Sequence, residues 1–170
     1  MFRKLAFPLM FFIAFWGTSQ DSATYSLGID LNYHPQDFFF HVRGQFSKKH
    51  LVQDAFLGFG INKTIFQGRL SPVTGYDVGY RFGFTNWLSL TPYLRVSYSF
   101  LNTKDPSGHP FIHTTESFLA CRLAVGTRNK LALNAGIGPA WEWKYDAYLE
   151  RNTHFFMWNY FFGLTYYHAF

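Results

Sequence analysis

Three alternate residues, His113, Thr115 and Ser117, come closest in this sequence to a nucleophilic catalytic group. A hydroxyl becomes a good nucleophile when a nearby histidine takes its proton, and a carboxylate commonly orients that histidine. In an extended strand these three residues share one face, whereas Glu116 points to the other face. The sequence therefore supplies a base and two hydroxyls without an orienting acid, which leaves the triad incomplete.

Four histidines in or beside polar connections, His34, His109, His113 and His154, raise the question of a metal or haem site. No pair of them has the i, i+4 spacing of a helical zinc site, and no cluster of Cys or Asp accompanies them. The single cysteine, Cys121, excludes an intramolecular disulfide and a multi-cysteine metal site. We therefore expect no metal and no cofactor, with the four histidines solvated at one rim of the molecule.

The elements that carry these residues are predicted to be strands, because apolar and polar residues alternate with a period of two. Tyr25, Leu27 and Ile29 fall on one face, for example, and Ser26 and Gly28 on the other. Eight segments show this alternation: 25–33, 38–46, 54–62, 76–84, 88–100, 116–125, 131–145 and 156–170.

Short and long connections also alternate along the chain. Residues 85–86 and 127–130 are predicted to be tight turns, whereas 63–74, 102–114 and 146–153 are longer and polar. Two connections depart from this rule, since 34–37 is short where a long loop is expected and 47–53 is long where a tight turn is expected. The pattern predicts an all-β, eight-stranded antiparallel up-and-down barrel. Pro92 and Pro139 lie inside predicted strands and suggest bulges, because proline donates no hydrogen bond to a neighbouring strand.

The bulk of the side chains indicates which face of this barrel points outward. The chain has 22 Phe, 11 Tyr and 5 Trp, and most of them fall on the apolar face, opposite Gly, Ser, Ala and Asn. An eight-stranded barrel encloses room for modest side chains only. The aromatic face would overfill that interior, which argues against a soluble lipocalin-like barrel. We therefore expect the aromatic face to contact lipid and the barrel to span a membrane.

Ten charged residues fall on the opposite, inward face, five of each sign. Unpaired charges inside a narrow lumen are costly, so balanced sets are expected to pair and to fill the interior. The predicted lumen charge network consists of Asp30, Arg43, Asp54, Asp77, Arg81, Arg95, Glu116, Arg122, Glu142 and Lys144. A filled lumen argues against a channel.

The first residues have the pattern of a cleaved export signal. Arg3 and Lys4 precede an apolar run over 5–16, and small residues follow at 17–19. A membrane-spanning helix needs about 20 apolar residues, more than this run provides. We predict a signal peptide over residues 1–19 and a single barrel domain over 20–170.

The end of the chain carries a recognisable pattern, with Phe162, Leu164, Tyr166 and Phe170 at alternating positions. It resembles the C-terminal assembly signal of the small eight-stranded outer-membrane β-barrel proteins of Gram-negative bacteria. His168 departs from that signal, which usually has an aromatic or large apolar residue at this position. The resemblance implies insertion by the outer-membrane barrel assembly machinery, contact with outer-membrane lipids and lipopolysaccharide, and both termini in the periplasm.

Three kinds of function fit these observations. The first is a structural or interaction protein with a filled lumen, or a subunit beside other outer-membrane proteins. The second is a lipid A-modifying enzyme, a deacylase or acyltransferase, although Thr115 stands where the deacylases of this class have the Ser of a His-x-Ser motif. The third is a narrow channel or ligand carrier. The scattered basic residues do not suggest nucleic-acid binding.

Overall fold

The computed structural model describes residues 23–35, 37–61, 71–102, 111–146 and 151–170. Within them the chain forms nine strands: β1 (Thr24–Tyr33), β2 (Phe38–Lys48), β3 (Leu51–Gly60), β4 (Pro72–Tyr80), β5 (Phe82–Gly83), β6 (Leu88–Asn102), β7 (Phe111–Val125), β8 (Asn129–Asp146) and β9 (Arg151–Ala169). None of the described residues belongs to a helix long and apolar enough to cross a membrane.

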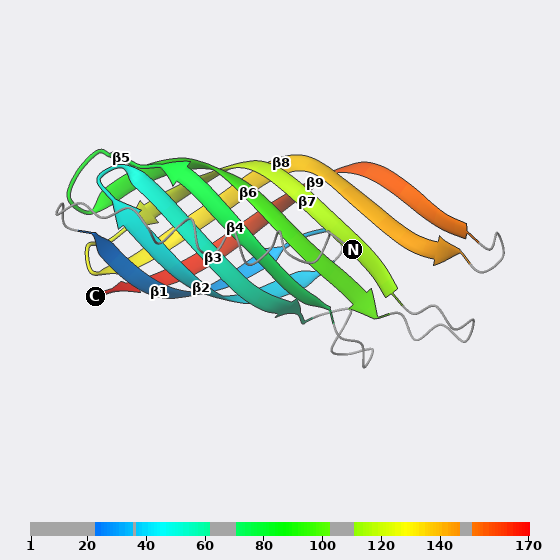
Figure 1. Cartoon of the computed structure of the whole chain (residues 1–170). Helices are drawn as coiled ribbons and strands as arrows, with labels where there is room; N and C mark the ends of the chain where they lie inside the picture. Colours follow the sequence, from blue (N-terminus) through cyan, green and yellow to red (C-terminus); the bar gives the residue numbers. More distant parts are fainter. Residues whose placement is uncertain (1–22, 36, 62–70, 103–110, 147–150) are drawn as a thin grey trace.

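The strands form one closed antiparallel sheet (Figure 1). Neighbours in sequence pair with each other except β4 and β5; β4 pairs with β6 instead, and β1 pairs with β9. The two-residue β5 continues β4, because Phe82 pairs with Leu90 in the register that Gly79 and Tyr93 establish. The predicted eight-stranded up-and-down barrel is thus confirmed.

The short turns lie together at one end of the barrel. The short turns over 49–50, 84–87 and 126–128 lie at the left in Figure 1, beside the C-terminus and the start of β1. The last described residues of β1, β3, β6 and β8 lie at the opposite end. We call these the turn end and the loop end. The expected long turn over 47–53 was wrong, because β2 and β3 continue to a two-residue turn in which Lys49 has a φ of 53°.

Strand length differs between the two halves of the chain. Strands β1 to β4 have 9 to 11 residues, close to the span of a bilayer, whereas β6 to β9 have 15 to 19. The longer strands extend past the others at the loop end (Figure 1). The bulges expected at Pro92 and Pro139 were wrong, because each strand keeps the same register on both sides of its proline. Beside each proline, however, the pairing with the strand on one side lapses for two residues.

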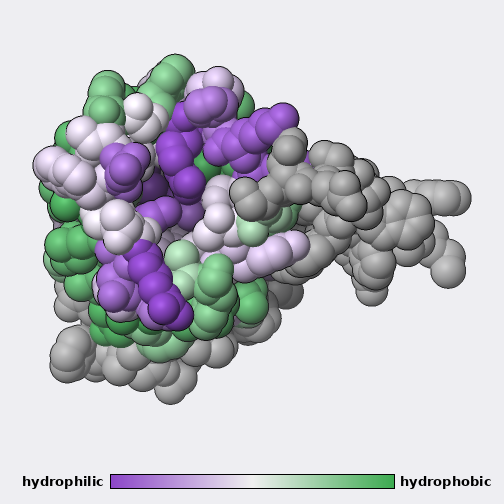
Figure 2. All heavy atoms as spheres, turned by 90° about the vertical axis from the view of Figure 1, so that its left-hand side faces the viewer, coloured by the Kyte–Doolittle hydropathy of each residue, from purple (hydrophilic) through white to green (hydrophobic). Residues whose placement is uncertain are grey.

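The outer wall of the barrel is apolar. Leu57, Leu133 and Trp158 are 67%, 61% and 69% exposed, whereas seven charged side chains of the strands are buried: Asp30, Arg43, Asp54, Asp77, Arg95, Glu116 and Arg122. At the turn end, hydrophilic residues occupy the centre and hydrophobic residues the outline (Figure 2). This arrangement is the inverse of a soluble barrel and requires lipid around the wall.

Candidate functional site in the packed lumen

The centre of the lumen holds a network of three arginines and three aspartates. The Arg43 guanidinium contacts three carboxylates: Asp30 at 2.6 Å, Asp54 at 3.1 Å, and Asp77. Arg95 donates to Asp77 at 2.9 and 3.1 Å. Arg122 lies 2.9 Å from Asp54 and 3.1 Å from Asp77. All six side chains are buried, and the structure thus brings together six of the ten predicted lumen charges.

Polar side chains of β8 and β9 complete this network. Arg122 donates to the side-chain oxygen of Asn134 at 2.8 Å, and Asn134 donates to the Thr165 hydroxyl at 2.7 Å. The Thr165 and Tyr167 hydroxyls donate to Asp30 and Asp54, respectively. Each of the eight strands therefore contributes at least one side chain to the network. We call these nine residues the central network: Asp30, Arg43, Asp54, Asp77, Arg95, Arg122, Asn134, Thr165 and Tyr167.

Aromatic rings pack against the arginines, which corrects the expectation of an interior lined by small residues. The guanidinium carbon of Arg95 lies 4.1 Å from the centre of the Phe161 ring, and that of Arg43 lies 4.7 Å from the Phe56 ring. Six aromatic residues are buried in the lumen: Phe39, Phe56, Tyr93, Phe118, Phe161 and Tyr167. The interaction between a desolvated guanidinium group and an aromatic face is favourable. The rings therefore fill the lumen and also fix the positions of the arginine side chains.

His34 closes the lumen towards the loop end. This residue was expected to be solvated at the rim, yet it is only 5% exposed. Its ring stacks on Phe161 at 5.6 Å and meets Phe39 and Phe118 edge-on. Its Nδ1 lies 3.7 Å from a Glu116 oxygen. We call His34, Phe39, Glu116, Phe118 and Phe161 the mouth cluster. The short connection after β1 folds inward because these rings exclude His34 from solvent.

The other predicted lumen charges lie apart from the central network. Glu116 accepts hydrogen bonds from Asn159 at 2.6 Å and Ser97 at 3.2 Å. Arg81 donates to Gln45 at 3.3 Å near the turn end. Lys144 lies over the Phe155 ring, and Glu142 is half-buried with no ion pair to another described residue. Sequence reasoning also missed His41, whose Nδ1 lies 3.1 Å from Asp30.

The candidate catalytic residues lie on the outer wall, near the loop end. His113 Nδ1 and the Tyr98 hydroxyl are 2.6 Å apart, and the His113 ring stacks on Trp143. Thr115 pairs with Trp141 across β7 and β8, and Ser117 follows on the same face. Glu116 lies between these residues in sequence and points into the lumen. The geometry thus gives His113 an aromatic setting and places the nearest carboxylate in sequence behind the wall.

Of the other histidines, His154 is exposed on β9 and His109 lies outside the described residues. No group of three metal-ligating side chains is placed to hold a metal ion in the described part of the chain.

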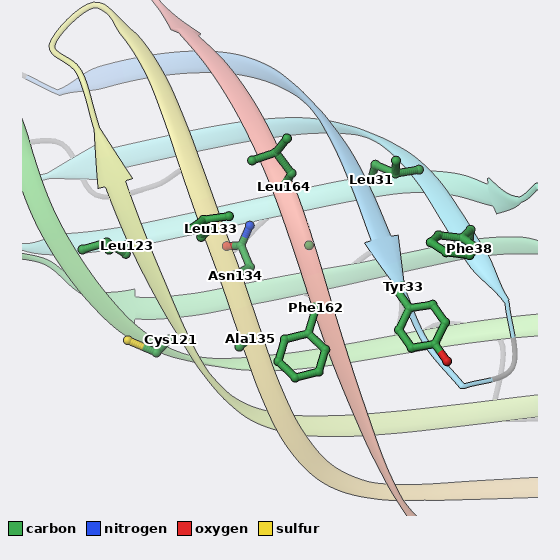
Figure 3. A pocket seen from close by; sticks show the side chains of 11 residues that line it. Leu31, Tyr33, Phe38, Cys121, Leu123, Leu133, Asn134, Ala135, Phe162 and Leu164 are labelled. Carbon is green, nitrogen blue, oxygen red and sulfur yellow. The ribbon is translucent and has the colours of Figure 1, made fainter.

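The residues of the predicted assembly signal, Phe162, Leu164, Tyr166 and Phe170, are exposed along the outer wall of β9 and just beyond it. His168 and Asn129 lie within hydrogen-bonding distance, at 2.8 Å. On the same wall, farther from the turn end, Cys121 and Ala135 line a shallow apolar depression with Leu123, Leu133 and Phe162 (Figure 3). It lies on the lipid-facing wall, where Cys121 serves as a small apolar residue.

Comparison with solved structures shows the same fold in distant proteins. The chain is similar to the N-terminal β-barrel domain of OprF from Pseudomonas aeruginosa, with a TM-score of 0.57 and 14% identity, covering 89% of this chain and all of that one. It is also similar to a major outer membrane protein from Thermus thermophilus, with a TM-score of 0.56 and 11% identity, covering 88% and 100%. No protein-family model and no curated protein sequence matches the chain. The chain thus has the fold of the small outer-membrane barrels.

Proposed function

We propose that this chain is an integral outer-membrane barrel with a closed lumen that acts as a structural and interaction protein, as a subunit beside other outer-membrane proteins. The observation that carries the proposal is the central network, in which side chains from all eight strands meet at the axis of the barrel. Side chains of the protein fill the lumen, so any interaction with other molecules uses surfaces outside the lumen.

The energetics of the central network favour a permanent filling. A buried ion pair contributes little net stability, but removing one partner leaves a desolvated charge and costs several kcal/mol. Arg43 contacts three carboxylates at once, and Asp77 contacts three arginines. Moving Arg43 or Arg122 aside would therefore take a cation from more than one carboxylate. The mouth cluster adds a second layer, mainly of packed rings, towards the loop end.

The orientation that we propose rests on a general feature of outer-membrane barrels, whose short turns face the periplasm. We place the turn end, with both termini of the mature chain, in the periplasm and the loop end outside. In this proposal residues 1–19 are removed on export, and the assembly machinery recognises Phe162, Leu164, Tyr166 and Phe170. Lipids and lipopolysaccharide surround the exposed aromatic wall, which includes Trp141, Phe156 and Trp158.

The experiment that tests the subunit role is extraction of the mature protein from native membranes in mild detergent, followed by native mass measurement. The full chain has a mass of 19.9 kDa. The proposal predicts a particle heavier than one barrel, with a fixed mass increment. A lone barrel at every detergent concentration would contradict the subunit role and leave a free-standing structural protein.

The enzyme alternative has its own test. A lipid A-modifying enzyme would use His113, Thr115 and Ser117 at the outer leaflet, where the structure surrounds His113 with Tyr98 and Trp143. Mass spectrometry of lipid A from cells with and without the protein decides the matter. The proposed function predicts identical lipid A, whereas a shift by one acyl chain would establish the enzyme.

A further inference from the structure

Strand β9 has an open edge towards the loop end. It pairs with β8 along its whole length, from Arg151 opposite Asp146 to His168 opposite Asn129. Its pairing with β1 is shorter and ends where Phe162 lies opposite Tyr33. Residues 151–161 thus have β8 on one side and no paired strand of the described chain on the other. Figure 1 shows this part of β9 extending with β8 past the end of β1.

The backbone groups that face this edge can be assigned from three hydrogen bonds. The Ala169 amide donates towards β8, to the Arg128 carbonyl, whereas the Phe170 amide donates towards β1, to the Tyr25 carbonyl. The Tyr160 amide donates to its neighbour, the Asn159 side chain. Backbone direction alternates along a strand, and the β8–β9 register is unbroken. The even-numbered residues from 152 to 160 therefore point their amides and carbonyls at the open edge.

This edge lacks the features that protect exposed strand edges. Protected edges commonly carry lysines, prolines or bulges, or are very short. Residues 151–161 contain no lysine and no proline, and Arg151 is the only charged residue. Each face carries exposed aromatic side chains, with Phe155 at 46% on the inner face and Phe156 and Trp158 at 59% and 69% on the outer face. An aromatic edge of this length is a template for another strand.

We propose that the open edge of β9, residues 151–161, binds an extended segment of a partner polypeptide, which adds to the barrel wall as one more strand. The inference rests on the proposed interaction function and names its site. Strand addition gains affinity from main-chain hydrogen bonds and specificity from alternate side chains.

A second copy of this chain does not fit the site. Two β9 edges pair antiparallel only if one barrel is inverted, whereas copies in one membrane share one orientation. Parallel pairing of two open edges would need a two-fold axis along β9. Because strands of outer-membrane barrels tilt by about 35–45°, that axis would incline one barrel by roughly 70–90° against the other. The occupant is therefore a segment of a different polypeptide.

The edge also constrains the sequence of the partner strand. Directly opposed side chains on one face of a sheet are in contact, so the outward positions of the partner meet Phe156, Trp158 and Tyr160. Aromatic or β-branched residues suit those positions. Opposite Arg151, at the tip of the hairpin, an acidic residue is favoured. The partner is thus an extended segment with alternate apolar residues and an acidic residue at one end.

The first test compares two substitutions at one position in the full-length protein. Phe156→Pro removes an amide that points at the open edge and leaves the bonds to β8 in place, whereas Phe156→Thr keeps the amide and removes the ring. Strand addition predicts that the heavier particle of native membranes is lost with Phe156→Pro and retained with Phe156→Thr. If the heavier particle survives Phe156→Pro, or if both substitutions abolish it equally, edge pairing is wrong. Circular dichroism of each variant checks that the barrel is folded.

The second test needs no variant and keeps the inference falsifiable if Phe156→Pro does not fold. Residue-resolved amide hydrogen exchange is measured on the wild-type barrel alone and in the heavier particle. Strand addition predicts protection of about tenfold or more at the amides of His154, Phe156 and Trp158 on complex formation. Unchanged exchange at these amides within an intact complex overturns the inference alone. A wild-type protein with no heavier particle overturns the interaction function itself.

Discussion

The guanidinium carbon of Arg95 lies 4.1 Å from the centre of the Phe161 ring, in the interior of the barrel. Phe161 also stacks against His34, so one ring joins the central network to the mouth cluster. Arg95 in turn donates to Asp77. The side chains that fill the lumen are therefore in contact from the central network to the rings of the mouth cluster.

Removing the ring that joins the two clusters should destabilise the barrel. Phe161→Ala leaves a cavity and exposes one face of Arg95, and we expect a loss of about 3 kcal/mol or more in the free energy of unfolding. Phe162→Ala is the matched control, because Phe162 faces outward and is 57% exposed. Urea titration of both variants in lipid nanodiscs gives the comparison. Equal losses at the two positions would contradict the assignment of the faces.

Arg43 contacts more carboxylates than the other arginines of the central network, and its removal should cost more than removal of an exposed arginine. Arg43→Ala leaves the carboxylates of Asp30, Asp54 and Asp77 with one cation fewer, and we expect a loss of about 3 to 5 kcal/mol. Arg151→Ala, at the exposed tip of β9, should have almost no effect on folding. Refolding yield and urea midpoint measure both. A stable Arg43→Ala barrel would show that the network does not hold the strands.

Gly163 has no room for a methyl group. A Cβ placed there would lie 1.8 Å from the Asn32 side-chain oxygen, which is buried beside Asp30. Gly163→Ala should therefore shift Asn32 and lower the urea midpoint. Gly44→Ala is the control, since a Cβ at Gly44 meets nothing within 4 Å. Unfolding of both variants at the same urea concentration would contradict this close packing at Gly163.

Cys121 reports directly on which face contacts lipid. It is the single cysteine of the chain and lies on the outer wall between lipid-facing leucines. In nanodiscs we expect a membrane-soluble maleimide to label it and a charged, water-soluble maleimide to fail. The variant Cys121→Ser with Asn152→Cys should react with both reagents, because Asn152 is exposed near the tip of the β8–β9 hairpin. Rapid labelling of Cys121 by the charged reagent would place this face in water.

The sequence predicts the eight strands and their two faces because alternation with a period of two is a direct consequence of strand geometry. It predicts the balance of lumen charges for the same reason. The buried aromatic rings were missed because they stand in runs such as Phe38-Phe39-Phe40 and Phe161-Phe162, where the alternation of polarity disappears and only position along the strand separates the faces. The sequence pattern therefore indicated an outward position for the aromatic residues in general.

The structure of the connections was harder to predict than that of the strands. His34 lies in a short polar connection, and only the rings of Phe39, Phe118 and Phe161, brought together from three strands, bury it. The two-residue turn over 49–50 could not be recognised in the sequence, because the polar residues beside it belong to the two strands. Which charges pair was also outside the reach of sequence, since Arg43 and Asp77 meet only when the sheet closes.

The most direct test of the closed lumen is single-channel conductance of the wild-type barrel in a planar lipid bilayer. The filled lumen predicts no conductance steps in wild-type protein. A variant that combines His34→Ala, Arg95→Ala and Phe161→Ala removes side chains from both clusters and should open measurable steps. Steady steps in the wild-type barrel, unchanged in that variant, would contradict the account.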